Sequence, residues 1–260
     1  MSSLSIGVTD LNDLPLPPME YRRLVGPTEP QFFDNPTHQP VFPDVPASTY
    51  ASVLDFGCGC GRLARQLIQQ HPRPARYVGI DRHKGMIEWC RANLAPAAPG
   101  FEFFHHDVLH PELNPHGTPG HVPFPVKDGD VTLLIAWSVF THLLEPDAEF
   151  YIRELARVLH PTGIAVTTWF LFDKGDFPMM QEFQNALLIN SQDPTNAVIF
   201  DRDWMLTQLA RAGLTVTTVR PPQIRGFQWT LHIQQQAADR VAATFPEDLA
   251  PRGLARPPVG

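Results

Sequence analysis

The feature that most constrains this chain is a glycine-rich turn between an apolar strand and a helix. Residues 53–64 read Val-Leu-Asp-Phe-Gly-Cys-Gly-Cys-Gly-Arg-Leu-Ala, with glycine at the alternate positions Gly57, Gly59 and Gly61. Glycine lacks the Cβ atom that would hold a ligand away from the backbone, and it accepts the positive φ angles that a tight turn requires. The pattern therefore predicts a cofactor-binding turn in which the backbone itself is the binding surface.

Two side chains beside this turn argue against a dinucleotide cofactor. The dinucleotide fingerprint Gly-x-Gly-x-x-Gly requires a third glycine where this chain has Arg62. Asp55, two residues before the first glycine, would repel the pyrophosphate of NAD or FAD. S-adenosylmethionine has no phosphate and carries a sulfonium and an ammonium group, so we expect Asp55 to favour that cofactor.

Residues 55–61, Asp-Phe-Gly-Cys-Gly-Cys-Gly, resemble the Asp-x-Gly-x-Gly-x-Gly signature of class I S-adenosylmethionine-dependent methyltransferases. Later elements follow in the order of that family, from about Ser52 to about Gln234. The resemblance implies a Rossmann-like fold, S-adenosylmethionine as the cofactor and methyl transfer as the reaction.

Strand and helix signals alternate along the middle of the chain. Short apolar runs predict strands, and amphipathic runs between them predict helices. The predicted strands are 52–56, 76–80, 101–105, 131–137 and 164–172, followed by an antiparallel hairpin of 214–219 and 227–233. The predicted helices are 61–70, 83–94, 147–159 and 203–212. This order predicts an α/β, Rossmann-like, doubly wound and mostly parallel seven-stranded sheet with an antiparallel C-terminal hairpin.

The distribution of proline divides the chain of 260 residues into three parts. Nine prolines interrupt residues 1–49, which predicts an arm that packs on the core rather than a domain. Residues 50–236 are predicted to be the methyltransferase domain, which is large enough to fold around one core. Residues 237–260 are predicted to be a flexible tail.

Charge and cysteine content exclude several classes of function. The formal charge of −7 offers no basic surface for nucleic acid, so we expect a small-molecule acceptor as the partner. Three cysteines are too few for a disulfide framework, and their spacing does not match a zinc site, so no metal is predicted. With no signal-like or membrane-spanning segment, the sequence predicts a soluble, cytoplasmic protein without membrane insertion. Spacing does not reveal the oligomeric state.

Cofactor candidates are sought at strand ends, because ligands of open α/β sheets bind at the carboxyl ends of the strands. Asp81 closes the second predicted strand and can accept from two ribose hydroxyls, although such an aspartate also often caps a helix. By resemblance, Met86 packs on adenine, Asp107 accepts from its amino group and Val108 offers a backbone contact. The alternatives are a core methionine and a turn aspartate.

The fourth predicted strand ends where a methyl group would meet its acceptor. Trp137 is predicted to wall the cofactor or the acceptor. The full predicted cofactor set is Asp55, Gly57, Gly59, Gly61, Asp81, Met86, Asp107, Val108, Ala136 and Trp137. The segment after this strand lacks an Asn-Pro-Pro-Tyr type motif, which argues against methylation of amide or base nitrogens. It also lacks a strand-end aspartate of the magnesium-binding kind.

Two side chains are candidate catalytic bases, because an alcohol acceptor must lose a proton. His142 follows the fourth strand and is the first candidate, with local hydrogen bonding as the alternative role. Asp173 follows the fifth strand within an aromatic segment and is the second candidate, with a solvated loop acid as the alternative. The long polar run 190–202 is predicted to be a lid over the acceptor.

The sequence therefore predicts an S-adenosylmethionine-dependent methyltransferase that methylates an oxygen of a small molecule, for example a sugar or glycolipid headgroup. Two other classes remain open. An NAD(P)-dependent oxidoreductase would share the glycine turn and Asp81. A non-catalytic cofactor-binding partner subunit would retain the turn and lack a competent acceptor pocket.

Overall fold

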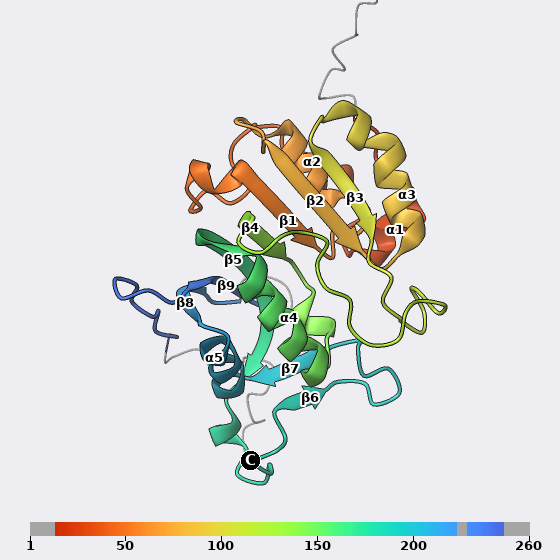
Figure 1. The fold of residues 1–260 in the computed structure, drawn as a ribbon. Helices are drawn as coiled ribbons and strands as arrows, with labels where there is room; N and C mark the ends of the chain where they lie inside the picture. Colours follow the sequence, from red (N-terminus) through yellow and green to blue (C-terminus); the bar gives the residue numbers. More distant parts are fainter. Residues whose placement is uncertain (1–13, 223–227, 247–260) are drawn as a thin grey trace, which may run out of the picture. The chain divides into compact units, whose positions relative to one another are not determined.

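The computed structural model describes residues 14–222 and 228–246 (Figure 1). The chain forms two compact units, Met1–Val122 and Pro123–Gly260, which we call the N-terminal and the C-terminal unit. Three parts of the sequence-based predictions lie outside the described residues. They are the beginning of the arm (1–13), the hairpin turn with the first residue of the last predicted strand (223–227), and the end of the tail (247–260).

Three parallel strands form the sheet of the N-terminal unit: β1 (Ser52–Phe56), β2 (Arg76–Asp81) and β3 (Phe101–His105). β2 lies between β1 and β3 and is buried along most of its length, as the apolar runs of a parallel sheet predict. Because the strands are parallel, β1 and β2 end at the same edge. The glycine turn and the residues after Asp81 therefore begin side by side.

Two longer helices follow these strands. α2 (Arg62–Gln69) begins directly after the glycine turn, and α3 (Lys84–Asn93) begins shortly after β2 (Figure 1). The cap of α3 is His83, whose Nδ1 accepts the N–H of Met86 at 3.3 Å. The short helices of this unit are α1 (Met19–Leu24), η2 (Pro30–Phe32), η3 (Ala47–Ala51) and η4 (Ala95–Ala97).

The described part of the proline-rich segment packs against α2. Phe33 is fully buried, and Asp34 Oδ1 forms an ion pair with Nη1 of Arg65 at 2.6 Å. Nη2 of Arg65 also donates to the carbonyl of Leu14 at 2.7 Å. Prolines prevent long elements here, but a buried ring and a buried guanidinium still hold the segment to α2.

The C-terminal unit has a mixed sheet. β4 (Val131–Ala136), β5 (Leu159–Phe172) and β7 (Val198–Asp201) pair in parallel, in that order. β6 (Ala186–Leu188) pairs antiparallel with β7. An antiparallel hairpin of β8 (Leu214–Arg220) and β9 (Gln228–Gln235) joins this sheet, since β9 also pairs antiparallel with β5. The helices are α4 (Glu145–Val158), α5 (Arg202–Arg211), η5 (Phe140–His142) and η6 (Lys174–Asp176).

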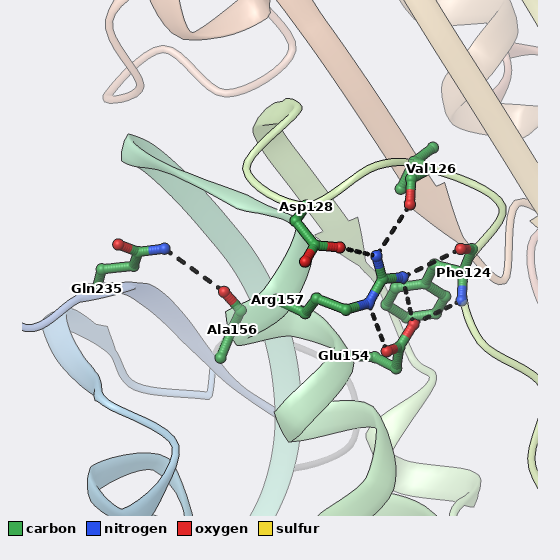
Figure 2. Close-up of polar contacts among 7 residues, drawn as sticks. All are labelled: Phe124, Val126, Asp128, Glu154, Ala156, Arg157 and Gln235. Carbon is green, nitrogen blue, oxygen red and sulfur yellow. Dashed lines mark hydrogen bonds and ion pairs between the residues drawn. The ribbon is translucent and has the colours of Figure 1, made fainter.

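A guanidinium network fixes the segment that leads into β4 (Figure 2). Arg157 of α4 forms a two-point contact with the carboxylate of Glu154, with both N–O distances at 2.7 Å. Its Nη1 also reaches Asp128 at 2.7 Å and the carbonyl of Val126 at 3.0 Å. The N–H of Phe124 donates to Glu154 at 2.7 Å. One arginine therefore binds the chain entering β4 to the last turns of α4.

The sequence-based prediction of an α/β fold with a mostly parallel sheet and an antiparallel C-terminal hairpin is confirmed. The described residues form nine strands rather than seven, because β7 lies within the polar run 190–202 that was predicted as a lid and β6 lies just before that run. The apolar run 197–200 was the available signal for β7. β5 also starts at Leu159 rather than at 164. Val131 pairs with Leu159 and Leu133 pairs with Ile164, so the residues between Leu159 and Ile164 form an irregularity within β5.

Within the described ranges, no helix is both long and apolar enough to cross a bilayer.

Candidate functional site

The glycine turn has the backbone geometry that the sequence predicts. Gly57, Gly59 and Gly61 have φ angles of 77°, 54° and 78°, so all three adopt conformations that side chains disfavour. A Cβ atom added at Gly61 would lie 2.5 Å from Cδ1 of Leu94. The N–H of Gly57 donates to the carbonyl of Ile80 at 2.8 Å, which holds the turn against the end of β2. The backbone conformation therefore favours glycine at all three positions, and at Gly61 the neighbouring Leu94 side chain also leaves little room for a larger residue.

Asp81 connects this turn to the start of α3. Its Oδ2 accepts the N–H of Gly59 at 2.8 Å, and its Oδ1 accepts the N–H of His83 at 2.8 Å. Burial raises the pKa of Asp81, while these two N–H groups act to lower it. Each carboxylate oxygen retains acceptor capacity beyond one hydrogen bond. Asp81 thus lies at the glycine turn, where a ribose contact is chemically feasible, and that role stays a prediction.

Asp55 lies inside the unit rather than on an open face. It is 1% exposed, and the hydroxyl of Tyr77 donates to its Oδ2 at 2.7 Å. Burial raises the pKa of Asp55 to about 7, although the Tyr77 hydrogen bond and the positive charge of Arg62 act to lower it. The sequence-based argument treated Asp55 as a fixed negative charge. The structure corrects that premise, because at neutral pH this carboxyl is partly protonated.

The predicted adenine contacts are engaged with the protein itself. Met86 is 3% exposed and belongs to a buried cluster with Phe33 and Cys60. The carboxylate of Asp107 accepts from Asn114 Nδ2 at 3.0 Å and from Thr118 Oγ1 at 3.1 Å, and these bonds lower its pKa.

Val108 makes an isolated bridge to Thr118, so the loop after β3 is organised around Asp107. These contacts are those expected of the alternative roles, in which Met86 is a core residue and Asp107 stabilises a turn. The proposed adenine roles of Met86, Asp107 and Val108 stay predictions.

The end of β4 contains a strained residue that sequence reasoning missed. Ala136 is fully buried at the last position of the strand, and Trp137 follows it. Ser138 then has a φ of 57°, which is uncommon for a residue other than glycine. Its N–H donates to Thr168 Oγ1 at 2.7 Å, and its hydroxyl donates to Gln228 Oε1 at 3.0 Å. No signal in the sequence marks a serine as left-handed, because partners from β5 and β9 impose that conformation.

The first candidate base, His142, has a defined tautomer. Its Nδ1 lies 2.8 Å from the carbonyl oxygen of Thr195. A carbonyl oxygen only accepts, so Nδ1 carries the proton and Nε2 of the neutral ring keeps its lone pair. The contact also ties η5 to the segment before β7. The local hydrogen bond was the alternative role for His142, and it leaves the second nitrogen chemically competent as a base.

The second candidate base, Asp173, is occupied on both oxygens. Its Oδ2 forms an ion pair with Nη2 of Arg202 at 2.8 Å, and its Oδ1 accepts the N–H of Gly175 at 2.8 Å. It thereby caps η6. A proton taken up by this carboxylate would weaken the ion pair, which makes Asp173 the poorer candidate. No cluster of three or more potential metal ligands occurs among the described residues.

In the N-terminal unit, the structure thus brings the three glycines of the turn together with Asp81 and with the cluster around Met86. In the C-terminal unit, it gathers the end of β4, His142 and the segment before β7.

Comparisons with known proteins agree with the fold and the turn. Residues 53–163 match the family model described as a methyltransferase domain. The chain is 36% identical over 100 residues to a trans-aconitate 2-methyltransferase from Azoarcus sp., a match covering 30% of this chain and 39% of that protein. It is 27% identical over 208 residues to a malonyl-[acyl-carrier protein] O-methyltransferase from Geobacter sulfurreducens, covering 78% of this chain and 70% of that protein.

A solved structure shares the fold. It is the Burkholderia thailandensis 1,6-didemethyltoxoflavin-N1-methyltransferase with bound 1,6-didemethyltoxoflavin and S-adenosylhomocysteine. The TM-score is 0.50 at 17% sequence identity, covering 72% of this chain and 71% of that one.

Residues 53–163 thus match a methyltransferase domain, and the glycine turn and the α/β fold agree with the class I S-adenosylmethionine-dependent methyltransferases that the sequence predicts. S-adenosylmethionine is the cofactor of this class. The oxidoreductase and the partner-subunit alternatives are not favoured by these matches.

Proposed function

We propose that this protein transfers a methyl group from S-adenosylmethionine to an oxygen atom of a small molecule. The observation that carries the proposal is the glycine turn joined to Asp81, where backbone N–H groups and a carboxylate lie together. Such a donor and acceptor set fits a nucleoside with ribose hydroxyls and no phosphate. The names of two relatives, which cite trans-aconitate and malonyl-[acyl-carrier protein], support a small or acyl-linked acceptor.

The proposed cofactor contacts follow from the site. Gly57, Gly59 and Gly61 would offer their backbone, and Asp81 would accept from the ribose. Around the adenine and the sulfonium, the proposed contacts come from Asp55, Met86, Asp107, Val108, Ala136 and Trp137. When bound, the cofactor supplies a methyl group that is activated by its positive sulfur. The protein's contribution is then to align the acceptor, and good alignment lowers a barrier by up to about 7–11 kcal/mol.

The acceptor oxygen can be a hydroxyl, as in a sugar or a glycolipid headgroup, or a carboxylate. A hydroxyl must lose its proton, and we propose that Nε2 of His142 receives it while Nδ1–H remains bound to Thr195. A carboxylate is already ionised at neutral pH and needs no base. The requirement for His142 therefore distinguishes the two acceptor classes.

Calorimetric titration with S-adenosylhomocysteine, with NADH as the control, tests the cofactor assignment. We expect saturable binding of S-adenosylhomocysteine and none of NADH. Binding of NADH alone would contradict the proposal and favour an oxidoreductase. Turnover is then measured with panels of hydroxylated and carboxylated acceptors, and binding without turnover on either panel would favour a non-catalytic subunit.

A further inference from the structure

A short segment of the proline-rich region lies directly on the glycine turn. Leu16, Tyr21 and Val25 pack against the buried cluster of Phe33, Cys60 and Met86. Cys60 belongs to the glycine turn, and Met86 is one of the predicted adenine contacts. The segment containing α1 therefore covers part of the proposed cofactor site.

The approach of this segment to the site is close at two points. A Cβ atom added at Gly59 would lie 2.6 Å from Cγ1 of Val25, and one added at Gly85 would lie 2.6 Å from the hydroxyl of Tyr21. The Tyr21 ring also meets the ring of His83 edge-on, at 5.4 Å between centroids. The side chains of Val25 and Tyr21 therefore occupy the space beside Gly59 and Gly85 that a larger residue would need.

The same helix carries a buried N–H group without an acceptor. Nη1 of Arg22 donates to the carbonyl of Thr28, whereas Nε is buried and has no hydrogen-bond partner within the described residues. Leaving a buried donor unsatisfied is unfavourable, and more so for a charged group. Although burial raises the pKa of the Cys60 thiol to about 12, the positive charge of Arg22 is among the opposing influences. The positive charge of Arg22 therefore acts on a residue of the glycine turn.

Two other arginines at the start of α2 already have acidic neighbours. The positive charge of Arg62 interacts with Asp55, and Arg65 forms an ion pair with Asp34. Arg22, in contrast, donates to a backbone carbonyl, that of Thr28. Nε of Arg65 is also buried without a hydrogen-bond partner, but Arg65 already binds a carboxylate through Nη1. Within the described residues, Arg22 has a buried, unpartnered N–H and no carboxylate bound to it.

We propose that Arg22 binds the carboxylate of the amino-acid part of the cofactor. This inference rests on the proposed function, since it presumes that S-adenosylmethionine occupies the glycine turn. The cofactor carries one carboxylate, whereas the other side chains assigned to its binding in this unit are acidic or apolar. The carboxylate would supply the acceptor that Nε of Arg22 lacks.

Calorimetry with two ligands that differ in this group tests the proposal. S-adenosylhomocysteine has the amino-acid carboxylate, and 5′-methylthioadenosine keeps the adenosine and lacks the amino-acid part. We expect Arg22→Met to weaken binding of S-adenosylhomocysteine by about 10- to 100-fold, the loss typical of a hydrogen bond to a charged group. Binding of 5′-methylthioadenosine should not change. Arg22→Lys, which keeps the charge, should recover part of the affinity.

Arg23→Met is the matched control, because Arg23 is the exposed neighbour on the same helix. It should leave the affinity for both ligands unchanged. An equal loss of both ligands in Arg22→Met would overturn the proposal, since Arg22 would then only hold α1 in place. An unchanged affinity in Arg22→Met would also overturn it, and a selective loss in Arg62→Met would transfer the role to Arg62. If the unaltered protein binds neither ligand, the proposed function itself fails.

Discussion

At the scale of single residues, burial changes what several side chains can do. Asp55 was predicted from the sequence as a carboxylate beside the ligand, yet it is enclosed with the hydroxyl of Tyr77 and its pKa rises to about 7. His142 keeps the position that the sequence indicates, and the carbonyl of Thr195 selects its tautomer. Residue type therefore identified both groups, whereas their surroundings raise the pKa of Asp55 and select the tautomer of His142.

Asp55 should make the stability of the protein depend on pH. The pKa of its carboxyl is about 7 in the folded state against an ordinary value of 3.8, so the folded protein retains a proton that the unfolded chain releases. Its stabilising contribution is complete below about pH 4 and is lost as the pH rises to about 7. Asp55→Asn keeps a neutral acceptor for Tyr77. We expect the variant to gain stability relative to the unaltered protein over this range, by on the order of a few kcal/mol.

Urea unfolding at pH 5, 6, 7 and 8 measures this difference. Tyr77→Phe is the companion variant, because removing the hydrogen bond should raise the pKa of Asp55 further and extend the loss of stability to higher pH. Parallel pH profiles for Asp55→Asn and the unaltered protein would show that Asp55 is ionised throughout.

At the scale of elements, side-chain networks fix the chain around the strands. In the C-terminal unit, Arg157 and Glu154 of α4 bind the backbone from Phe124 to Val126 (Figure 2). Burial raises the pKa of Glu154, but the hydrogen bonds from Arg157 and from the N–H of Phe124 reverse the effect and hold it below its usual value. Arg157 in turn has its pKa raised, first by the hydrogen bond to Glu154. The two groups therefore stabilise each other's charged form.

Loss of Arg157 should be costly. Arg157→Met would leave the nearly buried carboxylate of Glu154 without its cation, and removing one partner of a buried pair typically costs about 3–5 kcal/mol. Because Arg157 is partly exposed, we expect a cost near or below the lower end of that range. Chemical denaturation at pH 7 measures it. The double variant Arg157→Met/Glu154→Gln should recover part of the loss, and a stability unchanged in Arg157→Met would show that the network contributes little.

At the scale of the whole molecule, the question is which acceptor the enzyme methylates. The proposed base, Nε2 of His142, would serve a hydroxyl acceptor, whereas two relatives carry names that cite trans-aconitate and a malonyl group. A base contributes typically about 10²–10⁴-fold to the rate of a reaction that includes proton transfer. Removing the base should therefore distinguish hydroxyl acceptors from carboxylate acceptors more clearly than a measured binding affinity does.

We expect His142→Ala to lower kcat by about 10²–10⁴-fold on a hydroxylated acceptor. The affinity for S-adenosylhomocysteine should be unchanged, because His142 is not among the proposed cofactor contacts. Steady-state turnover and calorimetry measure the two quantities, with Asp173→Asn as the comparison because Asp173 is engaged by Arg202. A kcat that stays the same in His142→Ala would remove the proposed base and favour a carboxylate acceptor or alignment alone.

The larger elements could be predicted because their signals are local. β1 and β3 have the predicted bounds, and the helices differ by one or two residues at their ends. β6 was missed because its three residues pair with β7 across a long polar segment, and pairing of this kind is not a property of a short window. Ser138 was missed for a related reason, since its strained conformation depends on hydrogen bonds from β5 and β9.

The sequence by itself determined the class of the protein. Alternating glycines after an apolar strand permit the positive φ angles of a tight turn, so Gly57, Gly59 and Gly61 predict a cofactor site without reference to distant residues. Tertiary structure decided the chemistry around that turn, because charge and hydrogen bonding depend on neighbours far apart in the chain. It enclosed Asp55 with Tyr77, joined Asp81 to Gly59, and brought Tyr21 and Val25 to the turn through packing that no local pattern encodes.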